Sequence, residues 1–157
     1  MKVLFMCTAN SCRSILSEAV FNHLAPQGFE AISSGSFPKG QVLPRSLSTL
    51  QAAGISTEGL YSKGNDAFEG SPPDVVITVC DKAAGEACPV YFGPAVKVHW
   101  GLEDPSDAQG DEASVQAAFD TTLAIIATRC RAFFAVPFAE LSPAELKAEL
   151  VRIAGYQ

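Results

Sequence analysis

Long hydrophobic runs and clusters of basic residues are both missing from this sequence. No apolar stretch reaches the roughly 18 to 20 residues that a membrane-spanning helix needs, and the apolar start of the chain leads into polar residues instead of a signal-peptide core. The 11 Lys and Arg residues are outnumbered by 17 Asp and Glu residues, so the net charge is -6. We therefore expect a cytoplasmic protein that binds neither nucleic acid nor a membrane.

Disulfide frameworks and zinc motifs are not indicated either. The chain has 157 residues, of which 48% are hydrophobic and 18% charged, and a single domain of this size can bury a core without disulfides. Its cysteines are odd in number and include no C-x2-C pair: they are Cys7, Cys12, Cys80, Cys88 and Cys130. We therefore expect reduced thiols with chemical roles and no metal site.

Strand-like and helix-like segments alternate along the chain. Short apolar or β-branched runs predict four strands, at residues 2–6, 29–33, 74–79 and 96–100. Apolar residues at helical spacing predict four helices, at residues 14–25, 44–53, 111–135 and from 142 onward. This alternation predicts an α/β fold, with a single domain in which helices cover both faces of a four-stranded parallel sheet.

Reactive side chains follow three of the predicted strands. Cys7 and Cys80 come directly after a strand, and the acidic turn Glu103-Asp104 comes shortly after another. Because parallel sheets bind their ligands at the carboxyl ends of the strands, we expect these three segments to meet at one edge of the sheet.

The polar loop after the first strand has the pattern of an oxyanion site. Cys7 and Arg13 stand at its two ends, where the strand gives way to a helix. Backbone N–H groups and the positive helix end can surround a tetrahedral anion, and an arginine fork can bind two of its oxygens. The same field lowers the pKa of the Cys7 thiol, which predicts a thiolate nucleophile. The expected oxyanion-binding residues are Thr8, Ala9, Asn10, Ser11, Cys12, Arg13 and Ser14.

Two residues within this loop carry more specific expectations. Asn10 can adopt the left-handed backbone conformation that a tight anion loop needs. Cys12 has no obvious line of attack on a bound anion, so we interpret it as a packing thiol, like Cys130 on the apolar stripe of the long predicted helix.

Several motifs together resemble the low-molecular-weight protein tyrosine phosphatase superfamily, and within it the thioredoxin-coupled arsenate reductase branch. They are the loop from Cys7 to Ser14, Ser33-Ser34-Gly35, Thr78-Val79-Cys80-Asp81 with Cys88-Pro89, and the stretch from His99 to Pro105. Ala9 departs from the branch, which usually has glycine there, and is tolerable only if its φ angle is negative. The resemblance ends near Val136, so we expect a phosphatase-like domain at 1–136 and a C-terminal helical extension at 137–157 that packs on it or mediates dimerisation.

The resemblance implies an arsenate reductase that converts arsenate to arsenite for arsenic detoxification. Cys7 would attack arsenate held by the loop and Arg13, with Asp104 as the general acid. Cys80 would then form a disulfide with Cys7, and Cys88 would carry the oxidation outward as a disulfide with Cys80. Thioredoxin or a similar dithiol reductant would reset the enzyme, and no metal or organic cofactor is implied.

Two other functions stay open at this point. A low-molecular-weight protein tyrosine phosphatase would use Cys7, Arg13 and an acid, but it has no use for Cys80 or Cys88, so those two thiols favour the reductase. An inactive oxyanion sensor could contain the same loop.

The resemblance also implies a cation site beside the loop. In relatives, a potassium ion is held by residues that match Asn10, Glu18 and Ser33, and by an aspartate at the place of Lys63. We expect the Lys63 ammonium to take the place of the cation and to pair with Glu18, the alternative being a solvated loop lysine.

Overall fold

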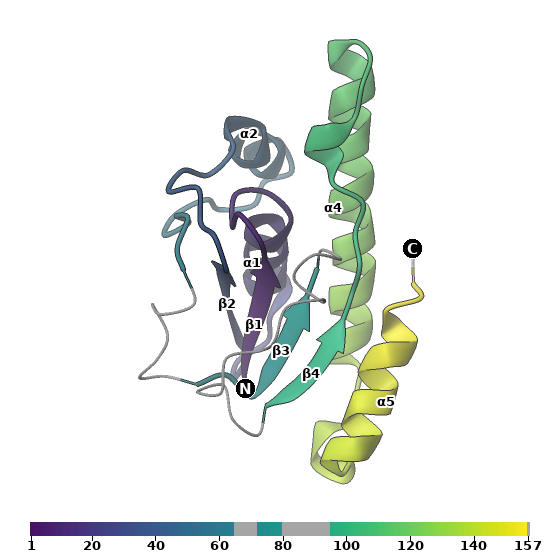
Figure 1. The fold of residues 1–157 in the computed structure, drawn as a ribbon. Helices are drawn as coiled ribbons and strands as arrows, with labels where there is room; N and C mark the ends of the chain where they lie inside the picture. The colour runs from purple at the N-terminus through teal and green to yellow at the C-terminus, as the bar shows by residue number, and fades with distance from the viewer. Residues whose placement is uncertain (65–71, 80–94, 157) are drawn as a thin grey trace.

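The predicted parallel sheet is present in the structure, a computed structural model that describes residues 1–64, 72–79 and 95–156. Its strands are β1 (Lys2–Cys7), β2 (Glu30–Gly35), β3 (Val75–Thr78) and β4 (Val96–His99). They form one four-stranded sheet in the order β2-β1-β3-β4, and every neighbouring pair is parallel (Figure 1). The expected α/β fold is therefore confirmed, and β1 occupies a central place with a neighbour on each side.

Four α-helices are described, and they begin close to the predicted positions. They are α1 (Arg13–Leu24), α2 (Pro44–Ala52), α4 (Glu112–Phe134) and α5 (Pro143–Ile153). The Asp111 side chain accepts a hydrogen bond from the backbone of Ser114 and so caps α4. The predicted capping box of Ser142 and Glu145 opens α5, with Pro143 in its first turn. In the described part of the chain, no helix is both long and apolar enough to span a bilayer.

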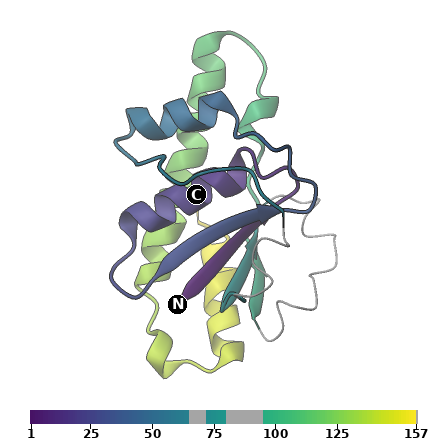
Figure 2. The same cartoon turned by 90° about the vertical axis from the view of Figure 1, so that its left-hand side faces the viewer.

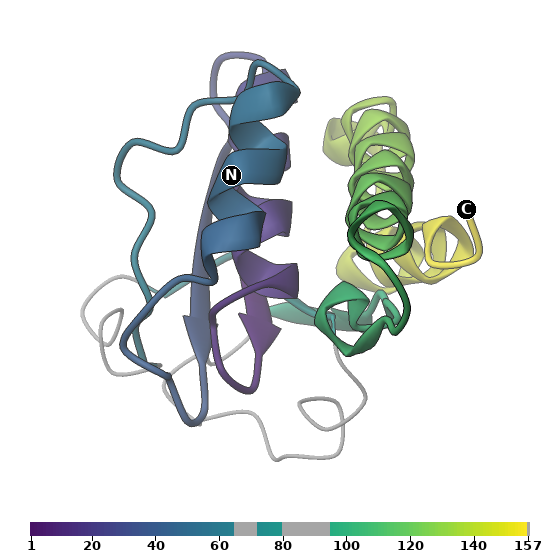
Figure 3. The same cartoon turned by 90° about the horizontal axis from the view of Figure 1, so that it is seen from above.

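All four of these helices lie on the same side of the sheet (Figure 3). On that side Phe5 and Ile77 belong to the main hydrophobic core. The opposite face contributes a second, smaller cluster made of Leu4, Met6 and Val76. Residues 1–64, 72–79 and 95–156 place no α-helix on this second face, where helices were also expected.

The C-terminal helix belongs to the main core. Figure 2 shows α5 beside the C-terminal half of α4. The side chains of Leu150 and Ile153 are fully buried, and the indole Nε1 of Trp100, just after β4, donates to the Leu150 carbonyl at 2.8 Å. Of the two roles considered for this helix, packing on residues 1–136 is therefore the one that the structure shows.

Truncation of Leu150 tests how much α5 contributes to stability. We expect Leu150→Ala to lower the free energy of unfolding by about 2–5 kcal/mol, because it leaves a cavity in the main core. Val151, the next residue on the same helix, is 55% exposed. Val151→Ala is therefore the matched control and should change the value by less than about 0.5 kcal/mol in urea unfolding. Equal effects of the two substitutions would contradict the placement of α5 in the core.

Candidate active site

Residues 37–43 hold the loop between β1 and α1 through hydrogen bonds to the carbonyl groups of the loop. The carbonyl oxygens of Thr8 and Ala9 accept hydrogen bonds from the backbone N–H groups of Phe37 and Lys39, at 2.9 and 3.0 Å. The Ser11 carbonyl accepts from the N–H of Leu43 at 3.0 Å. This arrangement favours an anion inside the loop, because carbonyl oxygens directed at an anion would repel it.

Asn10 fixes the shape of the loop from inside. It has a φ angle of 48°, the left-handed conformation that the sequence predicted, and its side chain is fully buried. Its Nδ2 donates to Ser14 Oγ at 2.8 Å and to Ser33 Oγ at 3.0 Å, while its Oδ1 accepts from the backbone N–H of Lys63 at 2.9 Å. Ala9 is not among the described non-glycine residues with positive φ, so its Cβ is tolerated, as expected.

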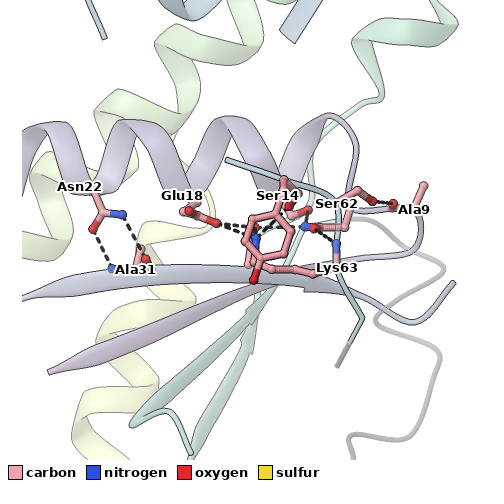
Figure 4. Close-up of polar contacts among 10 residues, drawn as sticks. Ala9, Ser14, Glu18, Asn22, Ala31, Ser62 and Lys63 are labelled. Atoms are coloured by element: carbon pink, nitrogen blue, oxygen red, sulfur yellow. Dashed lines mark hydrogen bonds and ion pairs between the residues drawn. The ribbon is translucent and has the colours of Figure 1, made fainter. Parts of the chain in front are cut away.

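The ammonium group of Lys63 pairs with Glu18 of α1 (Figure 4). Lys63 Nζ lies 3.3 Å from Glu18 Oε1 and donates to Ser33 Oγ at 3.3 Å and to the Tyr61 carbonyl at 3.0 Å. Ser33 Oγ donates to the same Glu18 oxygen at 2.6 Å. Lys63 is only 8% exposed, so this is a buried ion pair and not a solvated loop lysine.

Arg13 connects the loop to the acidic turn after β4. Its Nη2 lies 3.3 Å from Asp104 Oδ2, and its Nη1 donates to the Leu102 carbonyl at 3.1 Å. The other carboxylate oxygen of Asp104 accepts from the backbone N–H and the hydroxyl of Ser106, at 3.0 and 2.6 Å. Among the described residues, the buried Nε of Arg13 has no hydrogen-bond partner. Two of the three segments predicted to converge are therefore joined directly.

The described cysteines differ in what they can do. Cys7 ends β1 and is buried at the entrance to the loop, at 4% exposure. Burial raises the pKa of Cys12 to about 11 and that of Cys130 to about 12, so both remain protonated thiols at neutral pH. This agrees with the packing role predicted for them. Cys80 and Cys88 lie outside the described residues, and so does the loop between them.

Two further residues of the site were not singled out from the sequence. The Ser62 hydroxyl donates to the Ala9 carbonyl at 3.2 Å. In the sequence, only its position next to Lys63 could have pointed to Ser62. Arg129 of α4 donates to the Gly101 carbonyl at 3.0 Å, at the start of the acidic turn. Arg129 could have been noticed only as the neighbour of Cys130, because its acceptor is a backbone carbonyl.

Comparison with known proteins places this site in a family. The family model for low molecular weight phosphotyrosine protein phosphatase matches residues 2–151. An arsenate reductase of Bacillus subtilis is 30% identical over 131 residues, which are 83% of this chain and 93% of that protein.

Two solved structures are similar in both sequence and fold. A structure described as an arsenate reductase in the phosphate binding state has 27% identity and a TM-score of 0.68, over 83% of this chain and 93% of that one. The thioredoxin-dependent arsenate reductase of Corynebacterium glutamicum has 28% identity and a TM-score of 0.58, over 80% of this chain and 57% of that one.

The close approach of Gly35 to the loop gives a test of the loop geometry. A Cβ on Gly35 would stand 2.5 Å from the Thr8 carbonyl oxygen and 2.9 Å from the Asn10 nitrogen, and both are backbone atoms. We expect Gly35→Ala to shift the loop, because the added methyl group overpacks it. Phosphate affinity measured by calorimetry should fall about tenfold or more. Gly155→Ala is the control, because its nearest neighbour would be 3.5 Å away. Unchanged phosphate affinity in Gly35→Ala would show that the loop is not the binding site.

Proposed function

We propose that this chain, which belongs to the low molecular weight phosphotyrosine protein phosphatase family, is an arsenate reductase. The 3.3 Å contact of Arg13 with Asp104, beside a loop that begins with Cys7, supports oxyanion chemistry in which Cys7 would be the nucleophile, Arg13 the anion clamp and Asp104 the acid. A phosphatase would share this geometry, so the observation that carries the choice of a reductase is the similarity to arsenate reductases at about 30% identity. Relatives named arsenate reductase cover 83% of the chain.

Arsenate is the proposed substrate of the loop. The backbone N–H groups of residues 8–14 and the start of α1 would surround its oxygens. Arg13 would bind it as well, and arsenate would supply the acceptor that the buried Nε of Arg13 lacks among the described residues. The Cys7 thiolate would then attack arsenic, and Asp104 would serve as the general acid that supplies a proton to the departing hydroxide, which leaves as water.

Reduction of arsenic is proposed to follow through two further thiols. The Cys80 thiolate attacks the sulfur of Cys7, the sulfur–arsenic bond breaks, and its electron pair reduces As(V) to As(III), which leaves as arsenite. Cys88 then attacks Cys80, which releases Cys7 and leaves a Cys80–Cys88 disulfide. A thioredoxin-like dithiol would reduce that disulfide, in keeping with the thioredoxin-dependent relative. A cytoplasmic location would keep these thiols reduced.

A burst experiment with arsenate and no reductant tests the relay. Cys88→Ser is expected to release one arsenite per enzyme and stop as a Cys7–Cys80 disulfide, identified by mass mapping. Cys80→Ser should release none, because no internal thiol attacks the arsenic adduct. Cys7→Ser should also release none while it still binds phosphate, since the loop and Arg13 bind the anion. With thioredoxin, thioredoxin reductase and NADPH present, Cys130→Ser is the control and should turn over repeatedly.

Each alternative gives a different result in the same assays. A phosphatase would hydrolyse an aryl phosphate much faster than it consumed NADPH, and a sensor would release no arsenite. Repeated turnover by Cys88→Ser with thioredoxin as the reductant would remove Cys88 from the relay but leave the reductase.

We also propose that Lys63 acts as a built-in cation for the loop. Its ammonium is bound by Glu18, Ser33 and the Tyr61 carbonyl, which leaves little room or charge for a metal ion. Arsenite formation should therefore be the same in potassium and in sodium at fixed ionic strength. Lys63→Met, which removes the ammonium, should become dependent on potassium. Several-fold stimulation of the unmodified enzyme by potassium would refute this role.

A further inference from the structure

Arg129 of α4 is a buried cation that the proposed arsenate chemistry does not use. It lies on α4, next to Cys130 in the sequence, and is only 3% exposed. Burial lowers the pKa of its guanidinium from the ordinary value. Within the described residues it forms no ion pair with a carboxylate. Burying a charged arginine costs free energy, so the neutral groups that it bonds show what offsets that cost.

Those partners are two backbone carbonyls from separate parts of the chain. Arg129 Nη1 donates to the Gly101 carbonyl at 3.0 Å, and Nε donates to the Tyr156 carbonyl at 2.9 Å. Tyr156 follows the C-terminal end of α5, where the helix dipole favours a positive charge. Arg129 therefore ties the start of the acidic turn to two helices of the main core.

The acidic turn is held by cations at two successive points. Arg129 binds the Gly101 carbonyl, and one residue later Arg13 binds the Leu102 carbonyl at 3.1 Å. Asp104 follows two residues further along, with its carboxylate on Arg13. The direction in which this carboxylate points thus depends on where residues 101 and 102 are fixed.

Packing alone gives the turn limited support. A groove of about 660 Å³ separates Leu102–Pro105 from the Thr121–Ile125 stretch of α4, and Arg129 lies at its edge. A Cβ at Gly101 would stand 2.9 Å from His99 Nε2, so the imidazole fills the space on that side of Gly101. The bond from Arg129 to the Gly101 carbonyl opposes a shift of the turn into the groove.

We propose that Arg129 is a positioning residue that holds the 101–104 turn so that Asp104 faces the oxyanion loop. This rests on the proposed role of Asp104 as general acid. Arg129 touches neither arsenate nor a reacting atom, and it acts through the Gly101 carbonyl. Its loss should therefore slow the chemical step and leave anion binding by residues 8–14 almost unchanged.

The first measurement compares two arginines of the same helix. Arg129→Met keeps the aliphatic stem but loses both hydrogen bonds, and it should slow the single-turnover release of arsenite about tenfold, because small misplacements of a catalytic group are costly. Phosphate affinity in calorimetry should stay within about twofold of the original value. Arg131 is exposed on α4, so Arg131→Met is the control and should leave the rate unchanged. A loss of phosphate affinity equal to the loss of rate would overturn the proposal.

A double-mutant cycle then separates positioning from a general loss of stability. Asp104→Asn alone should slow the chemical step by about 100-fold, the usual contribution of a general acid. If Arg129 acts through Asp104, adding Arg129→Met to Asp104→Asn should change the rate by less than about twofold. A further tenfold loss in the double variant would show that Arg129 has only a structural role.

The same experiment distinguishes failure of this inference from failure of the proposed function. A normal rate in Asp104→Asn would refute the role of Asp104 as general acid. A slow Asp104→Asn together with a normal Arg129→Met would refute only the positioning role of Arg129. Arg129→Lys provides a second test if the Arg129→Met variant does not fold. Its ammonium can reach one carbonyl but not both, so its rate should lie below that of the unmodified enzyme but above that of Arg129→Met. In an Asp104→Asn background, Arg129→Lys should change the rate by less than about twofold, as expected for Arg129→Met.

Discussion

The side chain of Asn10 is the constraint on which the rest of the site depends. One buried amide joins α1 through Ser14, β2 through Ser33 and the segment before residue 64 through the backbone of Lys63. Those three partners come from separate parts of the chain and meet only if the sheet is formed. The loop between β1 and α1 is therefore shaped by the tertiary fold and not by its own sequence alone.

Ion pairs lie on two sides of this loop, Arg13 with Asp104 and Lys63 with Glu18. On the open side, Arg13 is shared between the loop and Asp104, so the same guanidinium can bind an anion and hold an acid near it. On the closed side, Lys63 and Glu18 neutralise each other within the core and stiffen the wall behind the loop. Three loop carbonyls accept hydrogen bonds from residues 37–43 and so would not repel an anion inside the loop. Arg13 is thus the cation that would meet an oxyanion on the open side, in a chain whose net charge is -6.

Much of this arrangement could be predicted because it depends on residues that are close together in the sequence. Alternating strands and helices indicated the parallel sheet, the Ser142–Glu145 box indicated the start of α5, and the requirement for left-handed backbone pointed to Asn10. The pairing of Lys63 with Glu18 followed from resemblance to relatives, since 45 residues separate the two in sequence.

Other features could not be predicted from residue types. The carbonyls of Leu102, Tyr61 and Gly101 act as acceptors, and every residue has a carbonyl. The role of Arg129 had no local sequence signal, because its partners come from just beyond β4 and from beyond α5. The placement of all four described helices on one face depends on how the connections cross the sheet, which local spacing does not reveal.

The indole of Trp100 gives the molecule an optical reporter of its own. The chain has one tryptophan, and it is 3% exposed, with its N–H bonded to α5 and its ring near Phe5 and Phe133. It also immediately precedes Gly101, where the acidic turn begins. Its emission therefore comes from one known place, between the core and the turn, so that movements of either can be followed by fluorescence without attaching a dye.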